Sequence, residues 1–108
     1  MIVIDEPLLD SFRNAPCELC GRRPASPHHL WAKGAGGGSR LDLPINLIAL
    51  CPPCHQNVHA GNIPRSLLLL AVARRERTTP GKIQDIIWKM RRTPGTLTLQ
   101  EAEKSRTP

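Results

Sequence analysis

Four cysteines form two CxxC pairs separated by thirty residues, with Cys17 and Cys20 in the first pair and Cys51 and Cys54 in the second. Four thiolates are the ligand set of a closed tetrahedral zinc site, whereas a disulfide framework belongs to oxidising compartments. The opening residues, MIVIDEPLLD, include acids where a secretory signal would be apolar, and the longest apolar run, 67–73, is too short to cross a bilayer. We therefore expect a cytoplasmic protein with no membrane partner and a structural Zn2+ on the cysteines.

The four histidines occur as two close pairs, one between the CxxC pairs and one just after them. His55 and His59 are four residues apart on a predicted helix, so both imidazoles lie on one face and can share a cation. His28 and His29 are adjacent at a predicted strand. Three imidazoles are thus candidate ligands of a divalent ion, and one is left to take a proton from water. Hydrolysis of a phosphodiester needs this division between a metal ion and a general base.

In order and spacing, His28-His29, Asn46 and His55-x3-His59, set in PHHLWAKGAGGG and NLIALCPPCHQNVHAG, resemble the HNH endonuclease family. The resemblance is to small bacterial and phage members with two CxxC pairs, and it covers roughly residues 17–61. It implies a ββα-metal fold, in which a β-hairpin and a following helix hold the catalytic ion. It also implies a hydrolase that nicks or cuts DNA, with His29 as general base and His28, His55 and His59 as ligands. Asn46 would brace the loop and orient the base.

One position departs from the family pattern, because many members have aspartate before the base and this chain has His28. The catalytic ion is expected among Mn2+, Mg2+, Ni2+ and Zn2+, and imidazole favours the transition ions over magnesium. Adjacent residues on a strand point to opposite faces, so His28 and His29 can serve one site only near a strand end or bulge. Two alternatives stay open: a non-catalytic zinc module that binds DNA or protein, and a nuclease that acts on RNA. No small-molecule cofactor is expected.

The elements that position these residues are predicted to be short. The chain has 108 residues, eleven prolines, eight glycines and only three aromatic residues, which indicates a small α+β fold with a thin core. We expect strands over 26–31 and 47–50, with a glycine-rich loop over 32–44 between them. Pro52 and Pro53 suit the first turn of a helix that ends near Ala60, with Gly61 following.

Three further helices are expected outside the zinc-closed segment: over 6–14, over 67–77 with Ser66 as its N-cap, and over 80–92. The last helix has one apolar stripe that we expect to be core, formed by Ile83, Ile86, Ile87 and Met90. The chain then divides into a nuclease module with its N-terminal helix (1–61), basic helices packed on it (62–95), and a flexible polar tail (96–108). We expect at most a short helix in the tail.

The net charge of +6 lies wholly in the C-terminal part of the chain. Residues 1–60 have five basic and five acidic side chains, whereas residues 61–108 have ten basic and four acidic ones. This excess favours a DNA-tracking surface, although ordinary solvated helix faces are the alternative. We expect DNA as the partner and a monomer or weak dimer. Six basic residues are candidates for phosphate contacts: Lys33, Arg40, Arg74, Arg75, Arg91 and Arg92.

Overall fold

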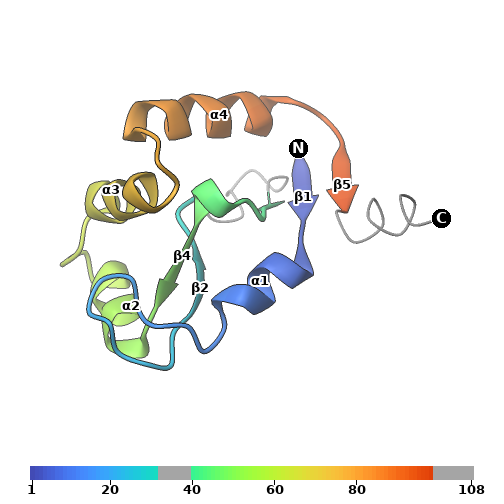
Figure 1. The fold of residues 1–108 in the computed structure, drawn as a ribbon. Coiled ribbons are helices and arrows are strands. Elements are labelled where there is room, and N and C mark those ends of the chain that lie inside the picture. The colour runs from blue at the N-terminus through green and yellow to red at the C-terminus, as the bar shows by residue number, and fades with distance from the viewer. Residues whose placement is uncertain (32–39, 99–108) are drawn as a thin grey trace.

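A computed structural model describes residues 1–31 and 40–98 of the chain. These residues form five short strands, four α-helices and one 3-10 turn, so the expected small α+β class is confirmed (Figure 1). Three of the helices follow one another along the chain, and the strands form two separate small sheets. None of the helices in the described ranges is both long enough and apolar enough to span a membrane.

The centre of the fold is an antiparallel pair of strands followed directly by a helix. Strand β2 (Ser26–His29) pairs with β4 (Leu47–Leu50), and every residue of β4 is buried. Helix α2 (Pro52–His59) begins one residue after the N-cap Cys51, with proline in its first turn where the missing N–H costs nothing. Gly61 follows the helix at φ +83°, a conformation that L side chains rarely adopt. The predicted strand and helix positions are therefore confirmed here, except that β2 ends two residues early.

The structure has a second sheet, of three strands, that the sequence did not predict. Strand β1 (Ile2–Ile4) lies between β3 (Arg40–Leu41) and β5 (Thr96–Thr98), and it is parallel to both. The predictions of a loop at residues 40 and 41 and of a flexible tail that begins at residue 96 are therefore both wrong, and the rest of the predicted tail (99–108) lies outside the described residues. Strands of two or three residues are too short to show a periodic pattern, and long-range pairing decides their structure.

Helix α1 (Glu6–Phe12) precedes the first cysteine pair and ends two residues before its predicted end. Helix α3 (Arg65–Arg75) begins after Pro64, so the expected N-cap Ser66 is wrong. The first turn is already closed by a bond from the amide of Leu67 to the carbonyl of Pro64. Ser66 therefore lies inside the helix.

Helix α4 (Pro80–Arg92) begins after Thr79, whose side chain accepts a hydrogen bond from the amide of Lys82 at 3.2 Å. Figure 1 shows α4 lying across the end of the molecule beside α3. Ile83 and Ile87 are buried in the core, but Ile86 is 44% exposed. The expected stripe is thus narrower than predicted, because successive helical positions turn by about 100° and only one side of α4 faces the protein.

Candidate functional site

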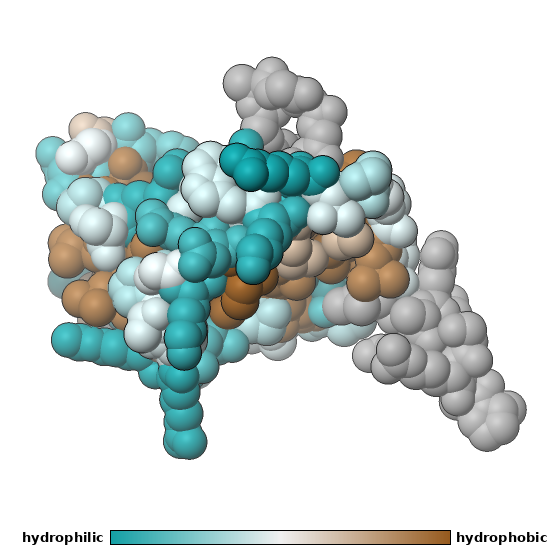
Figure 2. All heavy atoms as spheres, turned by 90° about the horizontal axis from the view of Figure 1, so that it is seen from above, coloured by the Kyte–Doolittle hydropathy of each residue, from teal (hydrophilic) through white to brown (hydrophobic). Residues whose placement is uncertain are grey.

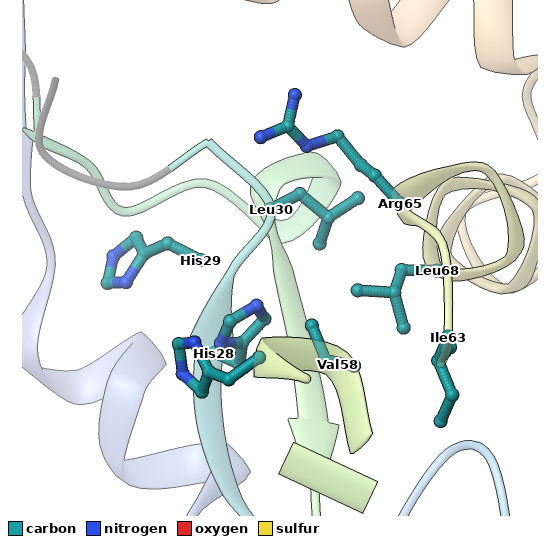
Figure 3. A pocket seen from close by; sticks show the side chains of 8 residues that line it. His28, His29, Leu30, Val58, Ile63, Arg65 and Leu68 are labelled. Carbon is teal, nitrogen blue, oxygen red and sulfur yellow. The ribbon is translucent and has the colours of Figure 1, made fainter. Parts of the chain in front are cut away.

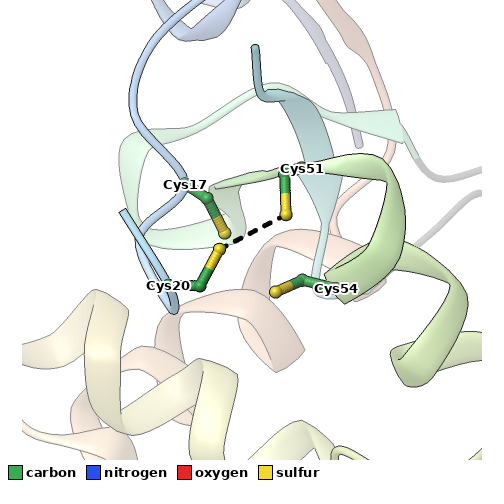
Figure 4. Close-up of side chains that lie close together, drawn as sticks. All are labelled: Cys17, Cys20, Cys51 and Cys54. Atoms are coloured by element: carbon green, nitrogen blue, oxygen red, sulfur yellow. Dashed lines mark hydrogen bonds between the residues drawn. The ribbon is translucent and has the colours of Figure 1, made fainter. Parts of the chain in front are cut away.

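The four cysteines converge at the start of helix α2 (Figure 4). Cys17 and Cys20 come from the turn after α1, Cys51 is the N-cap of α2, and Cys54 lies in its first turn. All four Sγ atoms lie within 4.8 Å of one another, and those of Cys20 and Cys51 are 3.4 Å apart. Sulfurs around a tetrahedral zinc with Zn–S bonds of ~2.3 Å lie ~3.8 Å apart. The cluster therefore fits a structural ion such as Zn2+.

Backbone hydrogen bonds hold the first cysteine pair in place against strand β4. The amide of Glu18 donates to the carbonyl of Ala49 at 2.9 Å, and the Ala49 amide donates to the Glu18 carboxylate at 2.7 Å.

Burial opposes ionisation of Cys17, but nearby backbone N–H groups, first that of Cys51, outweigh it and lower the thiol pKa to about 6. Burial raises the pKa of Cys54. The thiolate is the form that binds zinc, and Cys17 is already biased toward it.

Three of the four histidines form a second cluster, separate from the cysteines. His28 comes from β2, His55 and His59 come from α2, and their ring nitrogens lie within 4.8 Å of one another. The ring centroids of His28 and His55 are 4.9 Å apart, and the Nε2 atoms of His55 and His59 are 2.9 Å apart. The predicted ligands are thus brought together, and the donor set fits a divalent ion.

The surroundings of His28 and His55 favour their neutral form, which is the form that coordinates metal. Burial, together with the neighbouring rings of His55 and His59, lowers the pKa of His28 to about 4. Burial also lowers the pKa of His55, and His59 adds to the effect. Two of the three clustered histidines, His28 and His59, line a pocket that His29 and the apolar side chain of Leu30 also line (Figure 3). A ligand in this pocket would therefore lie beside these two ligand candidates and His29.

His29 is not part of the three-histidine cluster. It is the last residue of β2, and its ring lies apart from that of His28 in Figure 3, as expected of neighbours on a strand. Its Nε2 atom is 2.7 Å from Oδ1 of Asp42, a carboxylate that is completely buried. Sequence reasoning missed Asp42. The one signal was an acid between two leucines, Leu41 and Leu43, at the end of the glycine-rich loop.

Asn46 is completely buried and is the last residue of a 3-10 turn, η1 (Pro44–Asn46), directly before β4. Its Oδ1 accepts a hydrogen bond from the Trp31 amide at 2.9 Å, and its Nδ2 donates to the Leu41 carbonyl at 2.9 Å. A further bond joins Nδ2 to the Trp31 carbonyl at 3.2 Å. Asn46 therefore connects Trp31 to Leu41 and is not one of the clustered metal donors of the described residues.

Two of the expected phosphate-binding arginines have partners inside the protein. Arg40 donates to both carboxylate oxygens of Asp42 and to Glu6. Arg75 donates to Glu18 and to backbone carbonyls. Their side chains are only 25% and 27% exposed, respectively. These contacts give both arginines a structural role, and their contact with phosphate stays a prediction.

The other basic candidates differ in their surroundings. Arg74 and Arg92 are exposed, and within residues 1–31 and 40–98 neither takes part in an ion pair. The guanidinium of Arg91 lies 5.3 Å from the centre of the Trp88 ring, a cation-π contact on the surface of α4. Lys33 lies outside the described residues. Phosphate contacts on the C-terminal helices would therefore come from Arg74, Arg91 and Arg92.

Arg65 is a candidate that sequence reasoning missed. It is the first residue of α3, it is exposed, and it lines the pocket next to His28 and His59. Its guanidinium lies 5.2 Å from the centre of the Trp31 ring. Only the folded structure shows that Arg65 lies at the pocket, because nothing distinguishes Arg65 from the other arginines in the sequence.

The described residues thus define a small α+β protein in which helix α2 contributes to both a four-cysteine cluster and a three-histidine cluster. Comparison of the chain with protein-family models, with curated proteins and with solved structures finds no match. Function is therefore inferred from the arrangement of side chains in these clusters.

Proposed function

We propose that this chain is a metal-dependent HNH endonuclease that hydrolyses DNA phosphodiester bonds, with His29 as general base. One observation carries the proposal: the ring nitrogens of three imidazoles lie within 4.8 Å of one another, and the fourth imidazole, bonded to a buried carboxylate, lines the same pocket as His28 and His59. A purely structural zinc protein has no need of this second set of residues. The antiparallel pair β2–β4 followed by α2 supports the ββα-metal arrangement that the resemblance implies.

In this mechanism, His28, His55 and His59 would hold the divalent ion. When bound, the ion would neutralise charge on the scissile phosphate and on the departing 3′ oxygen. His29 accepts a proton from a water molecule, and the water oxygen forms a bond to phosphorus as the bond from phosphorus to the 3′ oxygen breaks. The 3′ oxygen takes a proton from solvent, which leaves 5′-phosphate and 3′-hydroxyl ends.

Positive charge near the pocket supports a polyanionic substrate. Arg65 lies at the edge of the pocket, where it can contact a phosphate next to the scissile one. Arg74 and Arg92 extend the basic surface over the C-terminal helices. Viewed from the α4 side, hydrophilic side chains cover much of the molecule, with small hydrophobic patches between them (Figure 2). The exposed arginines Arg74 and Arg92 are the residues that suit the DNA backbone.

The test is cleavage of supercoiled plasmid by zinc-loaded protein with Mn2+, Ni2+, Zn2+ or Mg2+ added. His29→Ala should lower the rate by ~10²–10⁴-fold with unchanged ion affinity, because a general base contributes to the barrier and not to ion binding. His55→Ala should weaken binding of the second ion in titration calorimetry. Gln56→Ala, at the next and exposed position of the same helix, is the matched control and should change neither. Intact plasmid with every ion, or near-normal turnover by His29→Ala, would contradict the proposal.

The alternative is a non-catalytic zinc module that binds DNA or protein, and the four-cysteine cluster by itself would suffice for it. Metal stoichiometry separates the two functions. The nuclease proposal requires a second cation site that His55→Ala weakens while the zinc on the four cysteines stays bound. One tightly bound zinc per chain, with no further cation binding at millimolar concentrations, would favour the non-catalytic module.

A further inference from the structure

Asp42 is a buried carboxylate surrounded by hydrogen-bond donors. Oδ1 accepts from His29 Nε2 at 2.7 Å and from Arg40 Nε at 3.2 Å. Oδ2 accepts from the other end of the Arg40 guanidinium at 2.9 Å and from the Asp5 amide at 2.9 Å. Burial alone would raise the pKa of Asp42, but the bonds from Arg40, Asp5 and His29 outweigh it and lower the pKa. Asp42 is therefore ionised near neutral pH and can only accept hydrogen bonds.

We propose that Asp42 is a positioning residue for His29, which it holds as the tautomer with hydrogen on Nε2 and a free lone pair on Nδ1. An ionised carboxylate has no hydrogen to give, so Nε2 of His29 must donate in the 2.7 Å contact. A neutral imidazole has one N–H, and Nδ1 is then the nitrogen able to take a proton. The catalytic consequence of this tautomer rests on the proposed function, whereas the tautomer itself does not.

The network around Asp42 makes Asp42→Asn an informative substitution. An asparagine amide must direct its NH2 group toward one of the two positions that the carboxylate oxygens now occupy. At the Oδ2 position the NH2 group would face Asp5 N–H and an Arg40 NH2 group, and neither can become an acceptor. At the Oδ1 position it would face His29, which can become an acceptor by changing tautomer, and the Nε–H of Arg40, whose longer 3.2 Å bond would be lost. The substitution should therefore move the His29 hydrogen to Nδ1.

The direct measurement is nitrogen NMR of histidine side chains in 15N-labelled protein with one equivalent of zinc, at about pH 8, where free imidazole is neutral. The His29 signals are assigned by their loss in His29→Ala. We expect the Nε2–H tautomer in the wild-type protein and the Nδ1–H tautomer in Asp42→Asn. An Nδ1–H form, or a mixture of both forms, in the wild-type protein would overturn the proposal. This wild-type result decides it even if the variant does not fold.

The kinetic measurement separates positioning from a structural effect. Asp42→Asn should lower kcat by ~10²–10⁴-fold with KM for DNA and the affinity for the second ion unchanged, as expected when a catalytic histidine has the wrong tautomer. Glu6→Gln is the matched control, since Glu6 bonds to Arg40 but not to Asp42 or His29, and it should leave tautomer and kcat unchanged. A folded Asp42→Asn protein with kcat within about threefold of wild type would overturn the positioning role. Absence of cleavage by the wild-type protein would instead refute the proposed function. The NMR measurement of the His29 tautomer would still test whether Asp42 positions His29.

Discussion

Arg75 connects helix α3 to the cysteine cluster and to the central strand pair, and Arg75→Gln tests this connection. Its guanidinium donates to Glu18 at 2.5 Å, to Glu76 at 2.9 Å and to the Leu47 carbonyl at 2.9 Å. A fourth bond reaches the Pro44 carbonyl. A glutamine amide is shorter and uncharged, so it can keep at most one of these bonds. We expect the variant to fold with a lower free energy of unfolding.

The magnitude follows from the exposure of each partner. A buried hydrogen bond to a charged group contributes ~1.5–3 kcal/mol, and an exposed ion pair contributes ~0.2–1 kcal/mol. The side chains of Arg75 and Glu18 are 27% and 21% exposed, so the contribution of their bond lies between these limits. The bond from Arg75 to the adjacent residue Glu76 is longer and should contribute less. With two backbone carbonyls also deprived of their donor, the decrease is roughly 2–4 kcal/mol. This is a large part of the ~5–15 kcal/mol typical of a whole domain.

The assay is urea unfolding of zinc-loaded protein, followed by circular dichroism at fixed zinc concentration. Arg74→Gln is the matched control, because Arg74 is the preceding residue of the same helix and is exposed. It should change the free energy of unfolding by less than about 0.5 kcal/mol. If the free energies of unfolding of Arg75→Gln and Arg74→Gln differed by less than about 0.5 kcal/mol, the internal role of Arg75 would be refuted.

Two further predictions concern the zinc cluster and the basic surface. Cys51→Ser should lose zinc and helical circular dichroism together, because ion binding in so small a module is nearly inseparable from its folding; a native-like spectrum and melting temperature in zinc-free protein would contradict this. Replacing Arg74, Arg91 and Arg92 with glutamine should reduce the salt dependence of DNA binding. The slope of log affinity against log salt concentration should become less steep by up to ~0.9 for each phosphate that the variant no longer neutralises. Binding is measured with the second ion withheld, and equal slopes for the two proteins would show these arginines to be ordinary surface.

The parts of the fold that the sequence predicts well are those with local determinants. Pro52 and Gly61 limit helix α2 through their own backbone preferences, and Thr79 with Pro80 does the same at the start of α4. Strand β4 is a continuous apolar run and is buried throughout. By contrast, the residues of β1 gain their structure from pairing with distant segments, as in Ile2 with Arg40 and with Thr96. No local pattern encodes such pairing.

The same distinction applies to the site. The ligand candidates could be found because CxxC and HxxxH place donors together through local geometry alone. Asp42 and Arg75 could not, because their roles depend on which groups from distant segments face them. Arg40 and Arg75 show the same limit: a basic side chain in the sequence suggests phosphate, and only the structure shows that both also have acceptors inside the protein.

The two clusters are mechanically joined through helix α2, since Cys54 and His55 are consecutive residues on it. Ligation of the cysteines would fix the start of α2 against the turn at residues 17–20, which is itself bonded to β4 through Glu18 and Ala49. Strand β4 pairs with β2, which carries His28, so His28 and the helix histidines are held on one continuous frame. A structural zinc at the start of α2 would therefore set the spacing of the three imidazoles. Its removal should separate them even though none of them belongs to the cysteine cluster.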